Sequence, residues 1–86
     1  MRNKFRFYSD PGHGWIAVHR YELEQLGLLG EITAYSYQRG NTVYLEEDQD
    51  ATTFVTKYEQ QFGKRPEFVE IIHDNTWIRY CDPYQQ

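Results

Sequence analysis

The sequence contains a single cysteine, Cys81, so the chain cannot form an internal disulfide. A chain without such a bond fits a reducing compartment. Long apolar runs are also missing, and none approaches the roughly 18 residues that a membrane-spanning helix needs. Residues 1–4 are not followed by the apolar segment of a secretory signal. We therefore expect a cytoplasmic protein that neither crosses a membrane nor is secreted.

Positive charge is scarce as well. Thirteen acidic residues outnumber nine basic ones, and the net charge of −4 argues against a nucleic-acid binder that neutralises phosphates. The excess is too modest to indicate DNA mimicry. The three histidines and Cys81 lack the spacing of a metal-binding motif, with no C-x-x-C and no H-E-x-x-H. We expect no metal and no cofactor.

Aromatic residues, in contrast, are abundant. They make up 17% of the 86 residues, and they are spread along the whole chain. A chain of this length forms one domain, and large aromatic side chains give its small core efficient burial. The sequence therefore predicts a single folded domain over residues 1–86, with 82–86 as a tail.

The first half of the chain predicts a hairpin followed by a short helix. Charged and aromatic residues alternate over Lys4–Ser9, and Trp15–Val18 resumes the strand pattern after a glycine-rich loop. A helix is expected from about His19 to Leu26, because Gly27 can close it in the left-handed conformation.

A second hairpin is predicted from Ile32–Gln38 and Thr42–Glu46. With a two-residue turn at Gly40-Asn41, which we favour, Tyr37 faces Tyr44 across the ladder. Both rings then point away from the helices.

The alternative is a three-residue turn. It would place Tyr35 and Tyr37 in the core beside Val43 and Leu45, because a one-residue slip exchanges the two faces of a strand. The register therefore decides whether these tyrosines are available for binding.

The clearest predicted element is a second helix. Its apolar positions repeat with helical spacing at Ala51, Phe54, Val55, Tyr58 and Phe62. Either Asp48 or Asp50 can cap its beginning, and Gly63 followed by Pro66 ends it.

A third hairpin is predicted from Glu67–His73 and Thr76–Cys81. This pairing sets Glu70 opposite Arg79. The core face would carry Val69, Ile71, Ile78 and Tyr80.

The resulting order is ββαββαββ. We predict an α+β fold with a mostly antiparallel sheet of about six strands and both helices on one face.

The loop from Asp10 to Trp15, with the sequence DPGHGW, is the densest unusual stretch. His13 could act there as a general base or a ligand beside Trp15. The simpler interpretation, which we favour, is a hairpin connection. In it Asp10 makes an Asx turn, while Gly12 and Gly14 adopt positive φ.

Two further groups of residues are candidates for binding. The acidic run Glu46, Glu47, Asp48 and Asp50 could bind a cation or a basic partner, although acids also complement the start of a helix. The other group is Tyr35, Tyr37, Tyr44, Arg39 and Arg79 with Trp77, which could form a recognition surface or stack a base and hold a phosphate. Equally, these tyrosines could be half-buried core residues whose arginine neighbours serve as ion-pair partners.

Several strings together resemble a family of small proteins from bacteriophages and prophages. They are the segment 7–15 with DPGHGW, the segment 36–40 with YxRG, the VYLEED string at 43–48 and the segment 78–80. The family has no established activity, so the resemblance implies no catalytic role. It implies a phage accessory protein that works in the bacterial cytoplasm.

These observations favour a non-enzymatic protein that binds and modulates a bacterial host factor, for example in counter-defence. A protein that sequesters a nucleotide or another small molecule through Tyr37, Tyr44, Arg39 and Arg79 is the alternative, with a homo-oligomer interface as one place for that site. A small enzyme that uses His13 is the third hypothesis.

Overall fold

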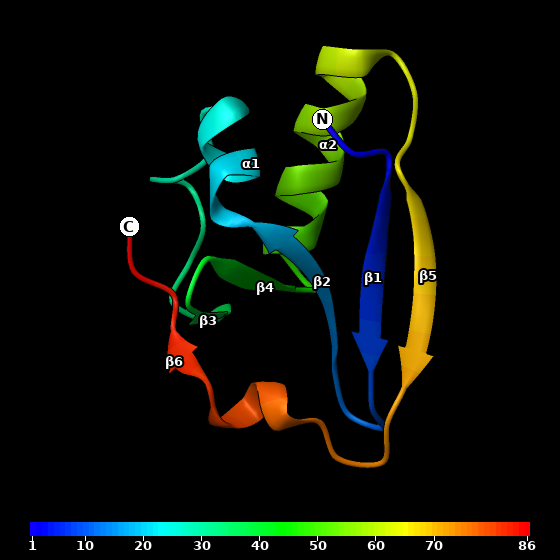
Figure 1. Cartoon of the computed structure of the whole chain (residues 1–86), viewed down its shortest axis with the longest axis vertical. Coiled ribbons are helices and arrows are strands. Elements are labelled where there is room, and N and C mark those ends of the chain that lie inside the picture. The colour runs from blue at the N-terminus through cyan, green and yellow to red at the C-terminus, as the bar shows by residue number, and fades with distance from the viewer.

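The computed structural model describes all residues, 1–86. A mixed sheet of six strands, in the order β5-β1-β2-β4-β3-β6, carries both helices on one face (Figure 1). The elements are β1 Lys4–Ser9, β2 Gly14–His19, α1 Arg20–Gln25, β3 Tyr37–Arg39, β4 Thr42–Glu46, α2 Asp50–Phe62, β5 Glu67–Ile72, the single-turn 3₁₀ helix η1 Trp77–Tyr80 and β6 Asp82–Pro83. All neighbouring strands are antiparallel except β1 and β5. The predicted α+β class, the mostly antiparallel six-stranded sheet and the one-sided placement of the helices are confirmed, and the predicted order of strands and helices holds up to β5.

The β1–β2 loop is the expected Asx turn. One carboxylate oxygen of Asp10 accepts hydrogen bonds from the N–H groups of Gly12 (3.2 Å) and His13 (3.1 Å). The expectation that Gly12 and Gly14 adopt positive φ is wrong. Gly14 is needed for space instead, because a Cβ there would lie 2.5 Å from Cζ of Phe7.

The β3–β4 hairpin has the favoured register, with Tyr37 opposite Tyr44 and Arg39 opposite Thr42. Gly40 begins the two-residue turn with φ of 58°, a value that glycine adopts without steric cost. The predicted strand over 32–38 is too long, since β3 begins only at Tyr37.

The residues before β3 form a turn because a buried carboxylate holds them there. Asp50 accepts hydrogen bonds from the N–H and hydroxyl of Thr33 and from the hydroxyl of Ser36. These bonds satisfy the buried charge, and they take segment 33–36 out of the sheet.

Helix α2 follows the predicted apolar repeat and ends at Gly63, whose φ is 75°. Its beginning differs from the prediction, because Gln49 is the N-cap residue and neither Asp48 nor Asp50 caps the helix. The Glu46 carboxylate does so from the end of β4, accepting the N–H groups of residues 48, 49 and 50 at 2.8 Å each.

Helix α1 ends as predicted, with Gly27 at φ of 71°. Its Glu22 carboxylate is fully buried and accepts hydrogen bonds from Arg2 and from the N–H of His19. Burial by itself raises the pKa of Glu22, but these hydrogen bonds outweigh burial and hold the pKa below its usual value.

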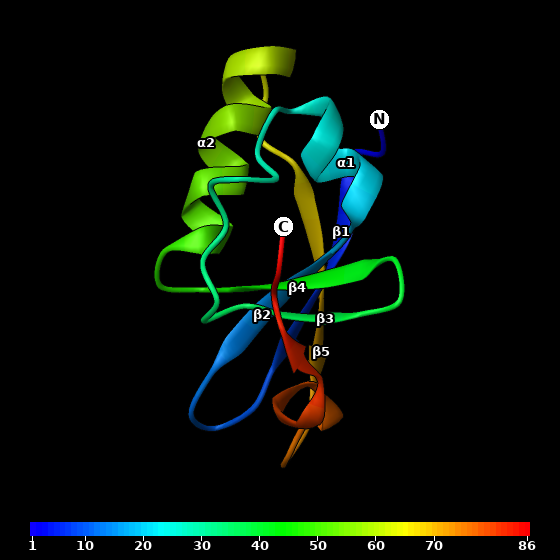
Figure 2. The same cartoon turned by 90° about the vertical axis from the view of Figure 1, so that its left-hand side faces the viewer.

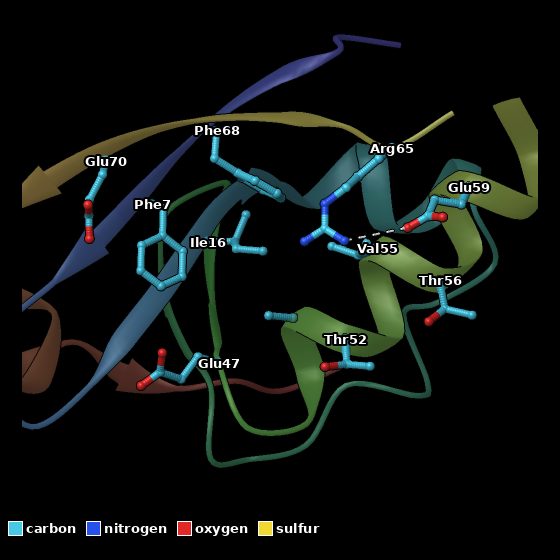
Figure 3. Close-up of a pocket in the computed structure, with 11 residues that line it drawn as sticks. Phe7, Ile16, Glu47, Thr52, Val55, Thr56, Glu59, Arg65, Phe68 and Glu70 are labelled. Atoms are coloured by element: carbon cyan, nitrogen blue, oxygen red, sulfur yellow. Dashed lines mark ion pairs between the residues drawn. The ribbon is translucent and has the colours of Figure 1, made fainter. Parts of the chain in front are cut away.

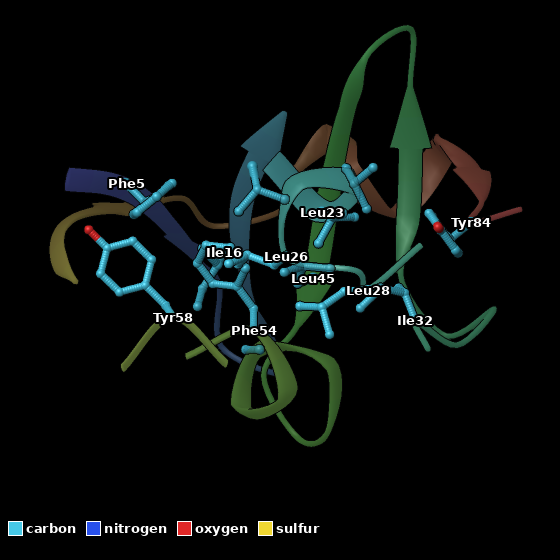
Figure 4. Packing of buried hydrophobic residues seen from close by; sticks show 13 residues of the cluster. Phe5, Ile16, Leu23, Leu26, Leu28, Ile32, Leu45, Phe54, Tyr58 and Tyr84 are labelled. Atoms are coloured by element: carbon cyan, nitrogen blue, oxygen red, sulfur yellow. The ribbon is translucent and has the colours of Figure 1, made fainter. Parts of the chain in front are cut away.

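The main core lies between the helices and the sheet (Figure 4). Phe54 of α2 meets Phe5 of β1 edge to face, with ring centroids 5.2 Å apart. The buried residues are Phe5, Ile16, Val18, Leu23, Leu26, Leu28, Ile32, Val43, Leu45, Ala51, Phe54, Tyr58 and Tyr84. Both helices and four strands or their flanking segments therefore share one apolar cluster.

The predicted third hairpin is wrong. β5 pairs in parallel with β1, and Trp77–Tyr80 forms η1 on the sheet face opposite the helices. Ile78 is fully buried there against Tyr8, Trp15 and Tyr44. Tyr8, Trp15 and Tyr44 form an apolar surface that Ile78 would not cover if residues 76–81 paired with β5 in a hairpin. Ile78 covers this surface because the chain turns away from β5 after Ile72.

The predicted core face of that hairpin is also wrong at two of its positions. Val69 and Tyr80 are 47% and 79% exposed. Glu70 does not meet Arg79, because η1 has carried Arg79 away from β5 to the β1–β2 loop.

Residues 82–86 are not a tail. β6 pairs with β3 at the far edge of the sheet, and the C-terminal segment runs beside that hairpin (Figure 2). Tyr84 is buried, and its hydroxyl donates a hydrogen bond to the carbonyl oxygen of Leu29.

Candidate functional site

Six of the residues that the sequence singled out meet at one cleft. It has a volume of about 380 Å³ and lies at the end of the sheet where the β1–β2 loop, segment 33–36 and the start of α2 converge. We call it the aromatic cleft. Its lining residues are His13, Trp15, Tyr35, Tyr37, Glu46, Asp48 and Gln49.

The floor of the aromatic cleft is rigid. Trp15 on β2 is only 2% exposed, and its ring centroid lies 6.4 Å from that of Tyr37 and 5.8 Å from that of His13. Tyr35 is 79% exposed, so its ring stands free at the rim. The cleft thus combines a fixed indole with phenol rings that solvent reaches.

Two carboxylates line the other wall, and they have different roles. Both oxygens of Glu46 accept backbone hydrogen bonds at the start of α2, which fixes this half-buried side chain. Asp48 is exposed, and no hydrogen bond or ion pair engages its carboxylate. This wall of the cleft therefore has one carboxylate that backbone hydrogen bonds hold in place, Glu46, and one without a hydrogen-bond partner, Asp48.

Arg79 of η1 contacts the Trp15 ring but does not line the cleft, and its charge is already paired. Its Nε and one terminal nitrogen donate to the two oxygens of Asp10 at 2.9 and 2.6 Å, and the guanidinium lies 5.5 Å from the Trp15 ring centroid. The pair holds the pKa of Asp10 well below its usual value, helped by the N–H groups of Gly12, Thr76 and His13. Asp10 and Arg79 therefore fasten η1 to the loop, and they leave the cleft without an unpaired cation.

The structure does not assemble the four residues proposed for nucleotide capture. Tyr44 is 8% exposed and packs against Trp77, with ring centroids 6.4 Å apart, and this burial raises its pKa. Tyr37 lines the cleft at one end of β3, whereas Arg39 lies at the other end, next to the turn. Arg79 is held by Asp10.

Glu47 points to the opposite side of the sheet, into a groove of about 520 Å³ between α2 and β5 (Figure 3). Its apolar lining includes Phe7, Val55 and Phe68. The Arg65 side chain extends into this groove from the segment after α2, and its Nη1 lies 4.0 Å from Oε1 of Glu59. Glu47 is the only residue of this groove that the sequence analysis named as a candidate for binding.

Sequence reasoning missed Gln49 as a cleft residue. It had indicated that the acidic run supports the start of α2, and Gln49 is the N-cap residue within that run. The position immediately before a predicted helix was therefore the available signal.

The side chains that could bind a metal ion or act as a nucleophile do not gather at one site. No group of three His, Cys, Asp or Glu side chains lies close enough together to hold a metal ion. His13 is exposed, with Nδ1 2.6 Å from the carbonyl oxygen of Gly12. Cys81 is half-buried with Sγ 3.8 Å from the carbonyl oxygen of Trp77, outside the cleft lining.

Neither helix has the length and apolar character that a membrane span requires. Comparisons of the chain with protein-family models, curated proteins and solved structures give no match. The geometry of the aromatic cleft is therefore the basis for a functional proposal.

Proposed function

We propose that the protein is a non-enzymatic binding module that holds a basic side chain of a partner protein in the aromatic cleft. One observation carries this proposal. Three aromatic rings and two carboxylates, those of Trp15, Tyr35, Tyr37, Glu46 and Asp48, line the same cleft with no unpaired cation among them. Aromatic faces and carboxylates both attract a guanidinium or an ammonium group.

The dimensions and exposure of the cleft support a side chain as the ligand. A volume of about 380 Å³ lies at the lower end of the range for ligand sites, so it accommodates one long side chain. Tyr35 and Tyr37 lie at its opening, and tyrosine is among the residues that dominate binding energy at protein interfaces. The net charge of −4 would also accelerate encounter with a basic partner.

The kind of partner follows from the resemblance to phage and prophage proteins. The DPGHGW loop supplies His13 and Trp15, while YxRG and VYLEED supply Tyr37, Glu46 and Asp48, so the motifs that carry the resemblance also build the cleft. We therefore take the partner to be a bacterial host factor in the cytoplasm, whose activity the phage protein modulates by binding.

A pull-down from bacterial lysate with tagged protein tests this proposal. The wild-type chain should recover a specific partner at micromolar concentration, and Tyr35→Ala and Asp48→Lys should each weaken recovery at least about tenfold, as loss of an interface anchor does. Arg39→Ala is the matched control, because Arg39 is exposed on the same hairpin but outside the cleft. Recovery of no partner, or equal recovery by all the variants, would contradict the proposal.

A further inference from the structure

β5 is a six-residue edge strand whose apolar side chains are poorly covered. Four of its six residues are apolar, yet none of the six is buried. Val69 is 47% exposed and Ile72 is 74% exposed, whereas the neighbouring strands β1 and β2 each place two or more side chains in a core. An apolar strand without cover at the edge of a sheet is a surface suited to association.

The backbone of β5 also has unused hydrogen-bonding groups. The N–H group of Glu67 donates to the carbonyl oxygen of Asn3 at 2.8 Å, and that of His73 donates to the carbonyl oxygen of Ser9 at 2.9 Å. The backbone N–H and C=O groups of every second residue from 67 therefore point toward β1. The N–H and C=O groups of Phe68, Glu70 and Ile72 therefore point outward, because alternate residues of a strand direct these groups to opposite sides. No part of the chain lies beyond β5 on that side (Figure 1).

The two edges of the sheet differ in how they are protected. β6 is only two residues long and contains Pro83, which has no N–H to offer. β5 has six residues in unbroken register with β1, and neither lysine nor proline interrupts it. Natural edge strands that remain free usually carry such interruptions.

We propose that β5 pairs with β5 of a second copy of this chain, antiparallel and about a two-fold axis. The two sheets then form one continuous sheet, with all helices on the same face, in a closed symmetric dimer. This inference goes beyond the proposed function and is independent of it. The aromatic cleft lies on β2, β3 and β4, away from β5, so the dimer presents two open clefts.

The outward groups select one register. When Glu70 lies opposite Glu70, Phe68 lies opposite Ile72, and all three outward-facing residues of each copy form ladder hydrogen bonds. On the other face Val69 then lies opposite Ile71. A shift by one pair in either direction leaves some of these groups unpaired and sets Glu70 against an apolar residue.

This register has one unfavourable contact, between the two Glu70 carboxylates, since like charges directly opposite each other destabilise a ladder. Each carboxylate can turn toward its own chain, where the Ser9 hydroxyl lies 3.2 Å away. The repulsion makes the dimer weak, and it gives the proposal a distinctive signature: removing the charge should strengthen association.

Sedimentation equilibrium of the full chain from about 10 μM to about 1 mM measures the association. The wild-type protein should show a reversible monomer–dimer equilibrium in this range. The double variant Val69→Lys/Ile72→Lys should weaken dimerisation at least about tenfold, and Glu70→Gln should strengthen it about two- to fivefold. Gln60→Lys, exposed on α2 away from β5, is the control for added charge. A monomer at all concentrations would overturn the proposal, as would a dimer that the double variant retains.

A disulfide test fixes the register. In a Cys81→Ser background, Glu70→Cys should form a covalent dimer under mild oxidation. Opposed residues of a hydrogen-bonded pair have Cα atoms about 5.5 Å apart, within the range of disulfides. Thermal unfolding by circular dichroism confirms that each variant is folded. A covalent dimer through Val69→Cys but not through Glu70→Cys would overturn this pairing.

Discussion

The two faces of the sheet are covered in different ways. On one face both helices bury a cluster of thirteen residues, with Phe54 at 0% exposure near its centre. On the other face the single turn η1 contributes Ile78 to a cluster of four, in which it packs on Tyr8, Trp15 and Tyr44. The helix face therefore depends on many contacts, and the η1 face depends on a few.

The aromatic cleft lies on the η1 face, which has fewer buried side chains than the helix face. Trp15 forms the floor of the cleft and also belongs to the small cluster under η1. Ile78, the Trp77 ring and the Asp10–Arg79 ion pair hold η1 against it. Global stability and cleft integrity should therefore respond to different substitutions.

The largest effect is expected on the helix face. Phe54→Ala should lower the free energy of unfolding by about 3–5 kcal/mol, because it removes a fully buried ring that contacts Phe5 and Tyr58. Urea denaturation followed by circular dichroism measures this loss. Phe62→Ala, at a 42% exposed position on the same helix, should cost about 1 kcal/mol or less. Equal costs for the two variants would contradict the distribution of stability described above.

A smaller but more local effect is expected on the η1 face. Ile78→Ala should cost about 2–4 kcal/mol and loosen η1, because Ile78 is the only η1 residue that is fully buried. Tryptophan fluorescence should shift to longer wavelength while the helical circular dichroism signal persists at low temperature. Tyr80→Ala, on the same turn and 79% exposed, should leave both signals unchanged. An unshifted emission spectrum in Ile78→Ala would show that η1 is held by other contacts.

The smallest effect concerns the ion pair and depends on pH. The pKa of Asp10 is lowered in the folded state, so its contribution to stability is fully present above about pH 4 and is lost as pH falls below that value. The difference in melting temperature between the wild type and Asp10→Asn should be largest near pH 7 and should shrink toward pH 3. Asparagine retains the ability to form the Asx turn, and Glu22, whose pKa is also lowered, is present in both proteins.

Asp74→Asn serves as the control for this series, because Asp74 is exposed and its carboxylate forms no hydrogen bond or ion pair. Its melting temperature should follow that of the wild type at every pH. A constant difference between the wild type and Asp10→Asn across the pH range would instead assign the effect to packing.

Elements built from local signals were predictable. The apolar repeat and Gly63 located α2, and Gly40-Asn41 set the register that turns Tyr37 and Tyr44 away from the helices. For the cleft, the sequence marked six of the seven lining residues, because unusual loops and exposed aromatic residues are local features. It did not show that Tyr44 is buried under η1.

The segment after β5 was predicted wrongly because its local signals suit two structures. Trp77, Ile78 and Tyr80 favour strands, and Asp74-Asn75 favours a tight turn, so a hairpin was the consistent local solution. The chain instead places Ile78 and Trp77 on the rings of Tyr8 and Tyr44. The contacts with Tyr8 join residues about seventy positions apart and those with Tyr44 residues more than thirty apart, so no short window of the sequence contains both sides of them.

By itself the sequence determined the elements whose hydrogen bonds close within a few residues: the two helices, two hairpins and the loop anchored by Asp10. Tertiary structure alone decided that β5 runs parallel to β1, that Trp77–Tyr80 coils over the second face, and that residues 82–83 complete the sheet. The physical reason is that apolar burial does not depend on separation along the chain. The last segment therefore took the conformation that covers rings supplied by the first half of the protein.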